Sequence, residues 1–169
     1  MISEPKLEYR DQLHTVGIRK RLTIQEFGTD LPALWDEVYG WVESKGLSAA
    51  GPAHLRYFSI DMDTFLDVEV GTPVEAAATG DERVTAGTTP AGQYATVIYT
   101  GDYPGLVSAN AALLEWGEKN DVTWQTTGEG AEMVWEGRFE YYFTNPDEEP
   151  DPEKWVTEVA FLTTNGQAQ

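Results

Sequence analysis

The residue that most clearly could take part in chemistry lies near the end of the chain, in the stretch KWVTEVAFL at residues 154–162. This stretch alternates as a β-strand does, and Glu158 falls on the same side as Val156, Ala160 and Leu162. A carboxylate among apolar side chains attracts cations, and desolvation raises its pKa toward values that suit general acid or base chemistry. The alternative is a solvated Glu on the exposed side of a strand. We predict a functional role for Glu158.

Two tyrosines have the chemistry to work beside that carboxylate. Tyr142 can hydrogen-bond Glu158 or donate a proton, and Tyr57 occupies the matching position in the first half of the chain. If the protein is an enzyme, Glu158 and Tyr142 are the predicted catalytic pair. For Tyr57, an ordinary half-buried strand tyrosine is an equally good interpretation.

Tryptophans can supply flat walls for aromatic ligands and π faces for cations. Trp41 and Trp116 lie near the ends of the two predicted helices, outside their apolar stripes, so we expect one or both at the mouth of a groove. Trp124 and Trp135 lie in the segment 123–137, where they can form a lid. A hydrophobic plug for that loop is the favoured interpretation.

The composition limits the classes of function. The 169 residues carry a formal charge of −18, and they include no Cys and only two His, His14 and His54. Thiolate chemistry, disulfides and a histidine metal site are therefore not expected, and no cofactor-binding fingerprint is present. Strong negative charge repels phosphate backbones and favours cationic ligands or a basic protein partner, although solubility alone accounts for it equally well. The N-terminus has no signal sequence and no apolar run has membrane-spanning length, so we expect a cytoplasmic protein without metal, cofactor, nucleic-acid or membrane contacts.

The apolar periodicity predicts a single α+β domain, 1–169, built from two β-α-β-β halves at about 6–74 and 83–163. Short matches, such as WVESKGL with WGEKNDV and RYFS with YYFT, indicate a duplication. In the first helix Asp30 is the expected N-cap and Pro32 lies in the first turn. The second half is expected to open with a hairpin. The predicted strands are 13–22, 55–62, 65–74, 83–89, 92–101, 138–145 and 154–162, and the predicted helices are 29–46 and 102–121.

Alternation along the strands also assigns two faces to the sheet. The opposite face to the helices is predicted to form a ligand groove, and it carries Tyr57, Glu69, Tyr142 and Glu158. Because Asp67 lies beside Glu69, a solvated position is the better interpretation for Glu69. The apolar set that is expected to pack against both helices comprises Leu66, Val68, Val70, Phe139, Tyr141, Phe143, Trp155, Val159 and Phe161.

Several blocks of the chain resemble the GyrI-like (gyrase-inhibitory-protein-like) effector-binding domain. They are LPALWDEVYGWVESKGLSAAGPAHLRYFSIDMD with DVEVGTPV, AGQYATVIYTGDYPGL, and FEYYFTNPDEEPDPEKWVTEV, and they follow the family's order from about Lys6 to about Thr163. The resemblance implies one antiparallel sheet made from two β-α-β-β units, with two helices on one face and a ligand groove on the other. It also implies that Glu158 and Tyr142 match the family's acid and tyrosine. The segment 123–137 departs from the family pattern.

Three functions are implied by this resemblance. The leading hypothesis is a stand-alone domain that binds lipophilic, aromatic or cationic small molecules, similar to the sensor domains of MerR-type and AraC-type activators. The match places no helix-turn-helix ahead of the domain, so a separate regulator would have to read its signal. The alternative is a hydrolase of cyclopropane-bearing genotoxic compounds, which would be a detoxification role. A further alternative is an inhibitor that acts on DNA gyrase by protein contact.

Overall fold

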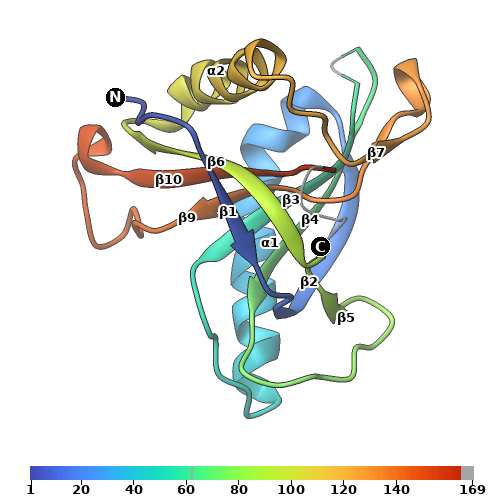
Figure 1. Cartoon of the computed structure of the whole chain (residues 1–169). Helices are drawn as coiled ribbons and strands as arrows, with labels where there is room; N and C mark the ends of the chain where they lie inside the picture. The colour runs from blue at the N-terminus through green and yellow to red at the C-terminus, as the bar shows by residue number, and fades with distance from the viewer. Residues whose placement is uncertain (62, 165–169) are drawn as a thin grey trace.

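Eight strands form one antiparallel sheet in the computed structural model, which describes residues 1–61 and 63–164 (Figure 1). Two helices pack on this sheet, α1 at Ile24–Ser44 and α2 at Leu106–Lys119. The order across the sheet is β1-β6-β10-β9-β3-β4-β2-β5, and β7 and β8 form a small separate pair. The strands are β1 Lys6–Arg10, β2 His14–Leu22, β3 Ala53–Ile60, β4 Leu66–Pro73, β5 Thr85–Thr88, β6 Gly92–Thr100, β7 Thr126–Thr127, β8 Val134–Trp135, β9 Arg138–Tyr142 and β10 Val156–Leu162, and the short 3-10 turns are η1 Tyr103–Gly105, η2 Gly130–Glu132 and η3 Pro152–Lys154.

The sheet has the same order in both halves when it is followed outward from its centre. β3 and β9 pair in the middle, followed by β4 and β2 on one side and by β10 and β6 on the other. The predicted α+β fold class, with one antiparallel sheet and two helices, is confirmed. A duplicated β-α-β-β unit would give this arrangement, although the duplication itself stays a prediction. Among the described residues, no helix has the length and apolarity needed to cross a membrane.

The two edges of the sheet differ from the predicted pairing. The expected hairpin of 83–89 with 92–101 is wrong, because β5 pairs with β2 instead of β6. β5 pairs with the backbone groups that the outer edge of β2 would otherwise leave unpaired. The contact between the two segments continues one residue beyond the ends of these strands, where Leu13 and Thr89 are joined by two hydrogen bonds. The free edge of β6 is covered by β1. Each half thus receives its edge strand from outside its own β-α-β-β unit, and this places Arg10 on the second half.

The helix α1 begins earlier than predicted. Thr23 is its N-cap, because its side chain accepts from the backbone N–H of Glu26 while the Glu26 carboxylate accepts from the N–H of Thr23. This capping box satisfies two of the donors that a helix start leaves free. Asp30 and Pro32 therefore lie inside the helix. The expected cap at Asp102 is present, but it is the N-cap of the short turn η1, which precedes α2.

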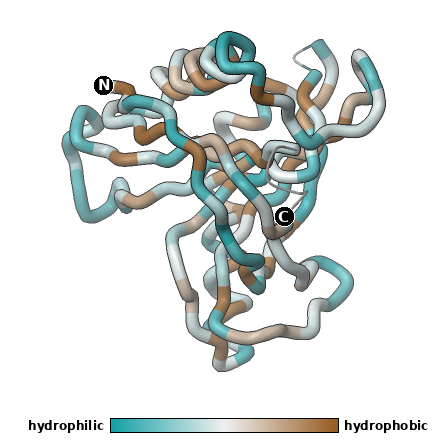
Figure 2. The backbone as a smooth tube through the Cα atoms, in the orientation of Figure 1, coloured by the Kyte–Doolittle hydropathy of each residue, from teal (hydrophilic) through white to brown (hydrophobic). Residues whose placement is uncertain are grey.

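Both helices cover the same face of the sheet. α1 packs on β2 and β4, α2 packs on β6 and β10, and the ring of Tyr142 contacts both apolar clusters. Figure 1 shows α1 behind β3 and β4, with α2 above β6. In Figure 2, apolar residues follow the strands, whereas the connection between β9 and β10 is hydrophilic. A smaller cluster lies on the helix-free face and consists of Tyr94, Phe139, Tyr141, Ala160 and Leu162.

The predicted faces are right for β4 and β10 and wrong for β9 and for Tyr57. The apolar residues of β4 and β10 pack beneath the helices, as expected. In β9, however, Phe139 and Tyr141 belong to the helix-free cluster, so Tyr142 faces the helices. Tyr57 also lies in the core beneath α1. The prediction failed because polar side chains of β9 fill the space between the two helices, where apolar ones were expected.

Glu69 is buried rather than solvated, with 8% of its surface exposed. Its strand β4 lies between β2 and β3, and its side chain lies against Gly17 of β2. Burial raises the pKa of Glu69, while the guanidinium groups of Arg56 and Arg19 oppose that shift. The polar neighbour Asp67 was therefore a poor guide, because Asp67 pairs with Arg19 at 2.9 Å.

Candidate functional site

Glu140 is a buried acid on the helix side of the sheet. It lies at the centre of the sheet in β9, opposite Val159 of β10 and Leu55 of β3, and only 4% of it is exposed. Its Oε1 accepts hydrogen bonds from the Tyr142 hydroxyl at 2.6 Å and from the Tyr57 hydroxyl at 3.0 Å. Its Oε2 accepts a hydrogen bond from Nδ2 of an asparagine of α2, Asn110, at 3.0 Å. Strands from both halves and one helix thus hold a single carboxylate.

The two tyrosines beside Glu140 keep their protons. Burial raises the pKa of Tyr57 and of Tyr142 well above the ordinary value, and the adjacent Glu140 charge raises both further. Both phenols therefore remain hydrogen-bond donors over the physiological pH range. Glu140 is consequently held by neutral donors, the two phenols and the Asn110 amide.

Arg138 is the cation nearest in sequence to this cluster, and its guanidinium lies beside the cluster without a direct contact with Glu140. It donates to Asn110 Oδ1 at 3.2 Å and lies over the rings of Phe161, at 4.4 Å, and Trp135, at 4.5 Å. Burial lowers the pKa of Arg138 to about 10, so it stays charged at neutral pH. Among the ion pairs in the described part of the chain, none includes Glu140. A bound cation could approach Glu140 without displacing a directly paired one.

Aromatic rings surround Tyr142, one of the two phenols that donate to this carboxylate. The ring of Trp35, from α1, meets Tyr142 edge-on at 5.2 Å between centroids. Tyr103, from η1, lies 5.7 Å from Tyr142 and 4.6 Å from Trp155. Tyr103 is 38% exposed. A buried carboxylate with a group of aromatic rings near it suits a lipophilic organic cation, because rings supply burial and cation–π attraction while the acid supplies the counter-charge.

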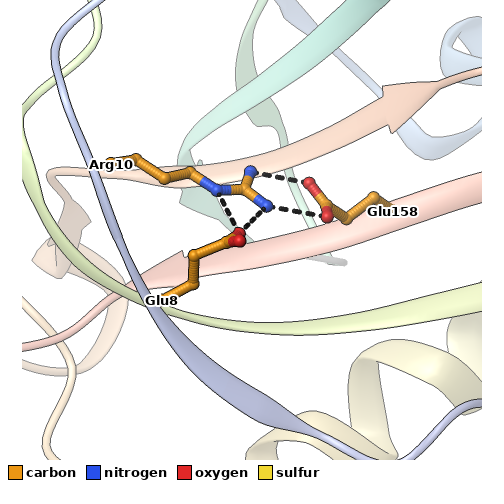
Figure 3. Close-up of polar contacts among 3 residues, drawn as sticks. All are labelled: Glu8, Arg10 and Glu158. Atoms are coloured by element: carbon orange, nitrogen blue, oxygen red, sulfur yellow. Dashed lines mark hydrogen bonds and ion pairs between the residues drawn. The ribbon is translucent and has the colours of Figure 1, made fainter.

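Glu158 lies on the helix-free face, as predicted, but a partner neutralises it. The Arg10 guanidinium donates to both carboxylate oxygens, at 2.6 and 2.7 Å, and also to Glu8 at 2.7 and 3.0 Å (Figure 3). Although burial opposes the shift, the hydrogen bonds that Arg10 donates to Glu158 and the charge of that carboxylate raise the pKa of Arg10. A bidentate guanidinium satisfies both oxygens of Glu158, which is only 6% exposed. This acid is therefore not a free anion.

A cavity of about 420 Å³ opens beside Glu158 on the helix-free face. Its lining includes Arg10, Tyr94, Tyr141 and Phe143. A cavity therefore lies on the face where a ligand groove was predicted, and Glu158 and Tyr141, rather than Tyr142, line it. That this cavity is a ligand groove stays a prediction. The structure brings Tyr142 and Tyr57 together, as predicted, but around Glu140 on the other face.

None of the four predicted tryptophans lines the cavity beside Glu158. Trp41 donates from its indole nitrogen to an aspartate in the loop before β5, at 2.8 Å. Trp116 packs against the core beneath α2. Trp124 and Trp135 pack against Phe161, with centroid distances of 5.4 and 5.3 Å, and so they match the favoured interpretation of a plug rather than a lid.

Three residues of these two sites were not identified from the sequence: Glu140, Asn110 and Arg10. A signal for Glu140 existed, because alternation places it on the same side of its strand as Tyr142. Asn110 lies within the buried stripe of α2, between Leu106 and Leu113, and a polar residue in that stripe was a signal that the sequence analysis missed. Arg10 reaches Glu158 across 148 positions of sequence through the β1–β6 pairing, which no local pattern indicated.

Solved structures share this fold. The C-terminal domain of EcmrR is 18% identical with a TM-score of 0.77, and the match covers 95% of this chain and 96% of that one. In the EcmrR–DNA complex the match covers 95% of this chain but only 57% of the longer EcmrR chain, at 19% identity and a TM-score of 0.78. A hydrolase from Listeria innocua is 13% identical with a TM-score of 0.63, covering 95% of this chain and 92% of that one. SAV2435, solved bound to tetraphenylphosphonium, is 15% identical with a TM-score of 0.59, covering 96% and 94%.

These identities establish the fold alone. No curated protein matches the chain significantly. The model of one family, the GyrI-like small molecule binding domain, matches residues 3–162. Because that match spans nearly the whole chain and agrees with the sheet, the helices and the structural neighbours, the chain belongs to the family of GyrI-like small molecule binding domains.

Proposed function

We propose that this domain binds lipophilic, aromatic organic cations between its two helices, with Glu140 as the counter-charge. The observation that carries the proposal is the environment of Glu140, a 4% exposed carboxylate held by two phenols and an amide. A buried carboxylate without a directly paired cation attracts a positive charge whose desolvation costs little free energy. Large aromatic cations meet that condition because their charge is spread over weakly hydrated surface.

Two further observations support this ligand class. The rings of Trp35, Tyr103 and Trp155 can exchange their present contacts for contacts with the rings of a ligand. The structurally similar SAV2435 was solved with tetraphenylphosphonium, which is such a cation. The net charge of −18 would also raise the local concentration of any cation around the protein.

The test is a calorimetric titration with tetraphenylphosphonium. Glu140→Gln preserves the shape of the side chain and removes its charge, so we expect its Kd to rise by at least ~10-fold, or about 1.4 kcal/mol. Glu158→Gln is the matched control, since it changes the same group on the opposite face, and its Kd should stay within about twofold of the wild-type value. Equal losses in both variants, or a loss only in Glu158→Gln, would refute the assignment to Glu140.

Hydrolysis is the second candidate for the same site. The hydrogen bond of 2.6 Å from Tyr142 to Glu140 joins a proton donor to a carboxylate, and a structural neighbour is described as a hydrolase. Glu140 would take a proton from a water whose oxygen bonds to a ring carbon as the strained carbon–carbon bond breaks. Tyr142 would give its proton to the carbanion-like carbon of the opened fragment, and Glu140 would pass the proton from the water back to the Tyr142 oxygen. Incubation with cyclopropane-bearing electrophiles, followed by mass spectrometry, tests this. A product that gains one water with wild type and not with Tyr142→Phe supports hydrolysis, whereas unchanged compound refutes it.

A further inference from the structure

We infer that the helix-free face carries a second, separate small-molecule site, which takes a neutral, ring-bearing lipophilic compound. The site is the cavity of about 420 Å³ beside Glu158, called here the outer cavity. Its volume is within the range of pockets that hold small molecules in proteins. It goes beyond the proposed function, because the proposed cation site lies on the other face of the same strands.

Beside its charged residues, the outer cavity has a lining that is largely apolar and preformed. Tyr94 is 2% exposed, and its hydroxyl is fixed by donating to the carbonyl of Pro90 at 2.6 Å. Tyr141 is 7% exposed and stacks on Phe139, with a centroid distance of 5.4 Å and an angle of 19° between the rings. Pro52 also lines the cavity. These groups are locked by packing, so a ligand would lose little affinity to the ordering of side chains.

The rim of the outer cavity is where a ring would find exposed apolar surface. Phe143 is 52% exposed and Leu13 is 44% exposed, and both line the cavity. The two residues come from different parts of the sheet, one following β9 and the other preceding β2. A bound ring would bury both of them and complete the walls described above.

Three charged residues line the outer cavity: Arg10, Asp11 and Glu158. Asp11 is exposed to water, so it attracts a cation only weakly. Arg10 is engaged by Glu158 and Glu8 together, so an anion would meet two carboxylates before it met a free guanidinium. A cation could reach Glu158 only by replacing Arg10, which would leave a half-buried guanidinium with one partner fewer. Arg10 and Glu158, drawn in Figure 3, can still form hydrogen bonds with a neutral polar group of a ligand. A neutral compound is therefore the class that fits.

The two sites are separated by the alternation of side chains on β9 and β10. Glu140 and Tyr142 point to the helices, whereas Tyr141 and Glu158 point to the outer cavity. A ligand on one face therefore does not occupy the space of a ligand on the other. Binding of a neutral compound and binding of a cation should be non-competitive.

The test uses the neutral fluorescent amine N-phenyl-1-naphthylamine, titrated into the full chain. We expect saturable enhancement of its fluorescence, and a Kd at least ~5-fold higher for Phe143→Ala, because an aromatic rim residue is lost. Val107→Ala is the control, since Val107 is a 75% exposed apolar residue on α2. Glu140→Gln and saturating tetraphenylphosphonium should leave the Kd unchanged.

Three results would overturn the outer site: no saturable signal, equal affinity for Phe143→Ala and wild type, or displacement of the amine by tetraphenylphosphonium. The last result would mean that the amine binds at the Glu140 site. A failure of tetraphenylphosphonium to bind at all would refute only the proposed function. Retained far-UV circular dichroism establishes that each variant is folded.

A charge change tests the selectivity argument separately. In a Glu140→Gln background, Arg10→Gln removes the cation that neutralises Glu158. The outer cavity should then bind the cation trimethylphenylammonium, and wild-type Arg10 in the same background should not. Equal binding with and without Arg10 would show that the Arg10–Glu158 pair does not set the charge preference of the cavity.

Discussion

His54 shows at the residue scale how the sheet treats a polar side chain that has no partner. It is fully buried in β3, and neither ring nitrogen has a hydrogen-bond partner within the described residues. Its ring instead meets the edges or faces of Phe139 and Tyr141, with centroid distances of 5.7 Å to each. Burial, and then the positive charge of Arg56, lowers the pKa of His54 to about 3. The imidazole is therefore neutral in the folded protein.

A pH dependence of stability follows from that shift. Between the ordinary pKa of about 6.5 and the folded value of about 3, the unfolded chain binds a proton that the folded chain does not. The free energy of unfolding therefore falls as the pH falls through this window. At pH 5 the loss attributable to His54 is about 2 kcal/mol relative to pH 7.

Urea denaturation of wild type and His54→Leu at pH 7 and pH 5 measures this loss. The carboxylates titrate equally in both proteins, so the difference between the two pH dependences isolates His54. We expect the variant to lose about 2 kcal/mol less than wild type on acidification. Equal losses would mean that His54 is accessible to protons in the folded state.

The sequence identified the residues that are capable of chemistry better than it predicted which of them lie in contact in the fold. The apolar surroundings of Glu158 were predicted correctly, since they depend only on alternation within one strand. Its neutralisation by Arg10 depends on a contact between the two ends of the chain. The Glu140 cluster was assigned to the wrong face because it breaks the rule that the helix side of a sheet is apolar, and such breaks occur at functional sites.

At the scale of elements, replacement of two helical glycines by alanine is expected to change the stability of the fold in opposite directions. Gly40 lies in α1 with no atom within 4 Å of the position that a Cβ would take. In α2, a Cβ on Gly117 would lie 2.3 Å from Cζ2 of Trp124, a ring that is itself packed against Phe161. Gly40→Ala should stabilise the fold by roughly 0.5–1 kcal/mol through helix propensity. Gly117→Ala should destabilise it by about 1–3 kcal/mol because the overlap outweighs the same gain.

The check is urea denaturation of both variants at pH 7, with tryptophan fluorescence and circular dichroism as independent probes. Gly40→Ala serves as the matched control, because the chemical change and its effect on the unfolded chain are the same. Stabilisation by both substitutions would show that the segment carrying Trp124 is free to move away from α2.

Element types were more predictable than element boundaries and pairings. The strands of β4 and β10 and both helices follow from periodicity. The start of α1 was misplaced because Asp30 and Pro32 resemble a helix start, whereas the capping box at Thr23 and Glu26 forms earlier. The partner of β5 was misassigned because a hairpin is the nearest available pairing, and the free edge of β2 competes for the same strand.

At the scale of the whole molecule, the exchange of edge strands connects the halves more closely than a tandem duplication would. β1 belongs to the N-terminal segment but pairs with β6 in the second half, and β5 follows the first half but closes its outer edge. Neither half therefore keeps its full set of strands if the chain is cut between them. Only long-range pairings determine this, and they leave no periodic pattern in the sequence.

The net charge of −18 gives the last prediction. Even if every basic residue is paired, the excess acids repel one another across the whole surface, and folding brings them closer together. Salt screens this repulsion, with a Debye length that shortens from roughly 14 Å at 0.05 M to about 4–5 Å at 0.5 M. The melting temperature at pH 7 should therefore rise by several degrees across this range of sodium chloride.

Differential scanning calorimetry at the two salt concentrations measures the effect, and the same salt step near the isoelectric point is the control, where the net repulsion is absent. A melting temperature that falls with salt at pH 7 would contradict the prediction. It would mean that ion pairs such as Arg10–Glu158 and Arg19–Asp67 stabilise the fold more than the excess charge opposes it. Because partly buried pairs are screened less than surface charges, we expect the repulsion to dominate the salt response.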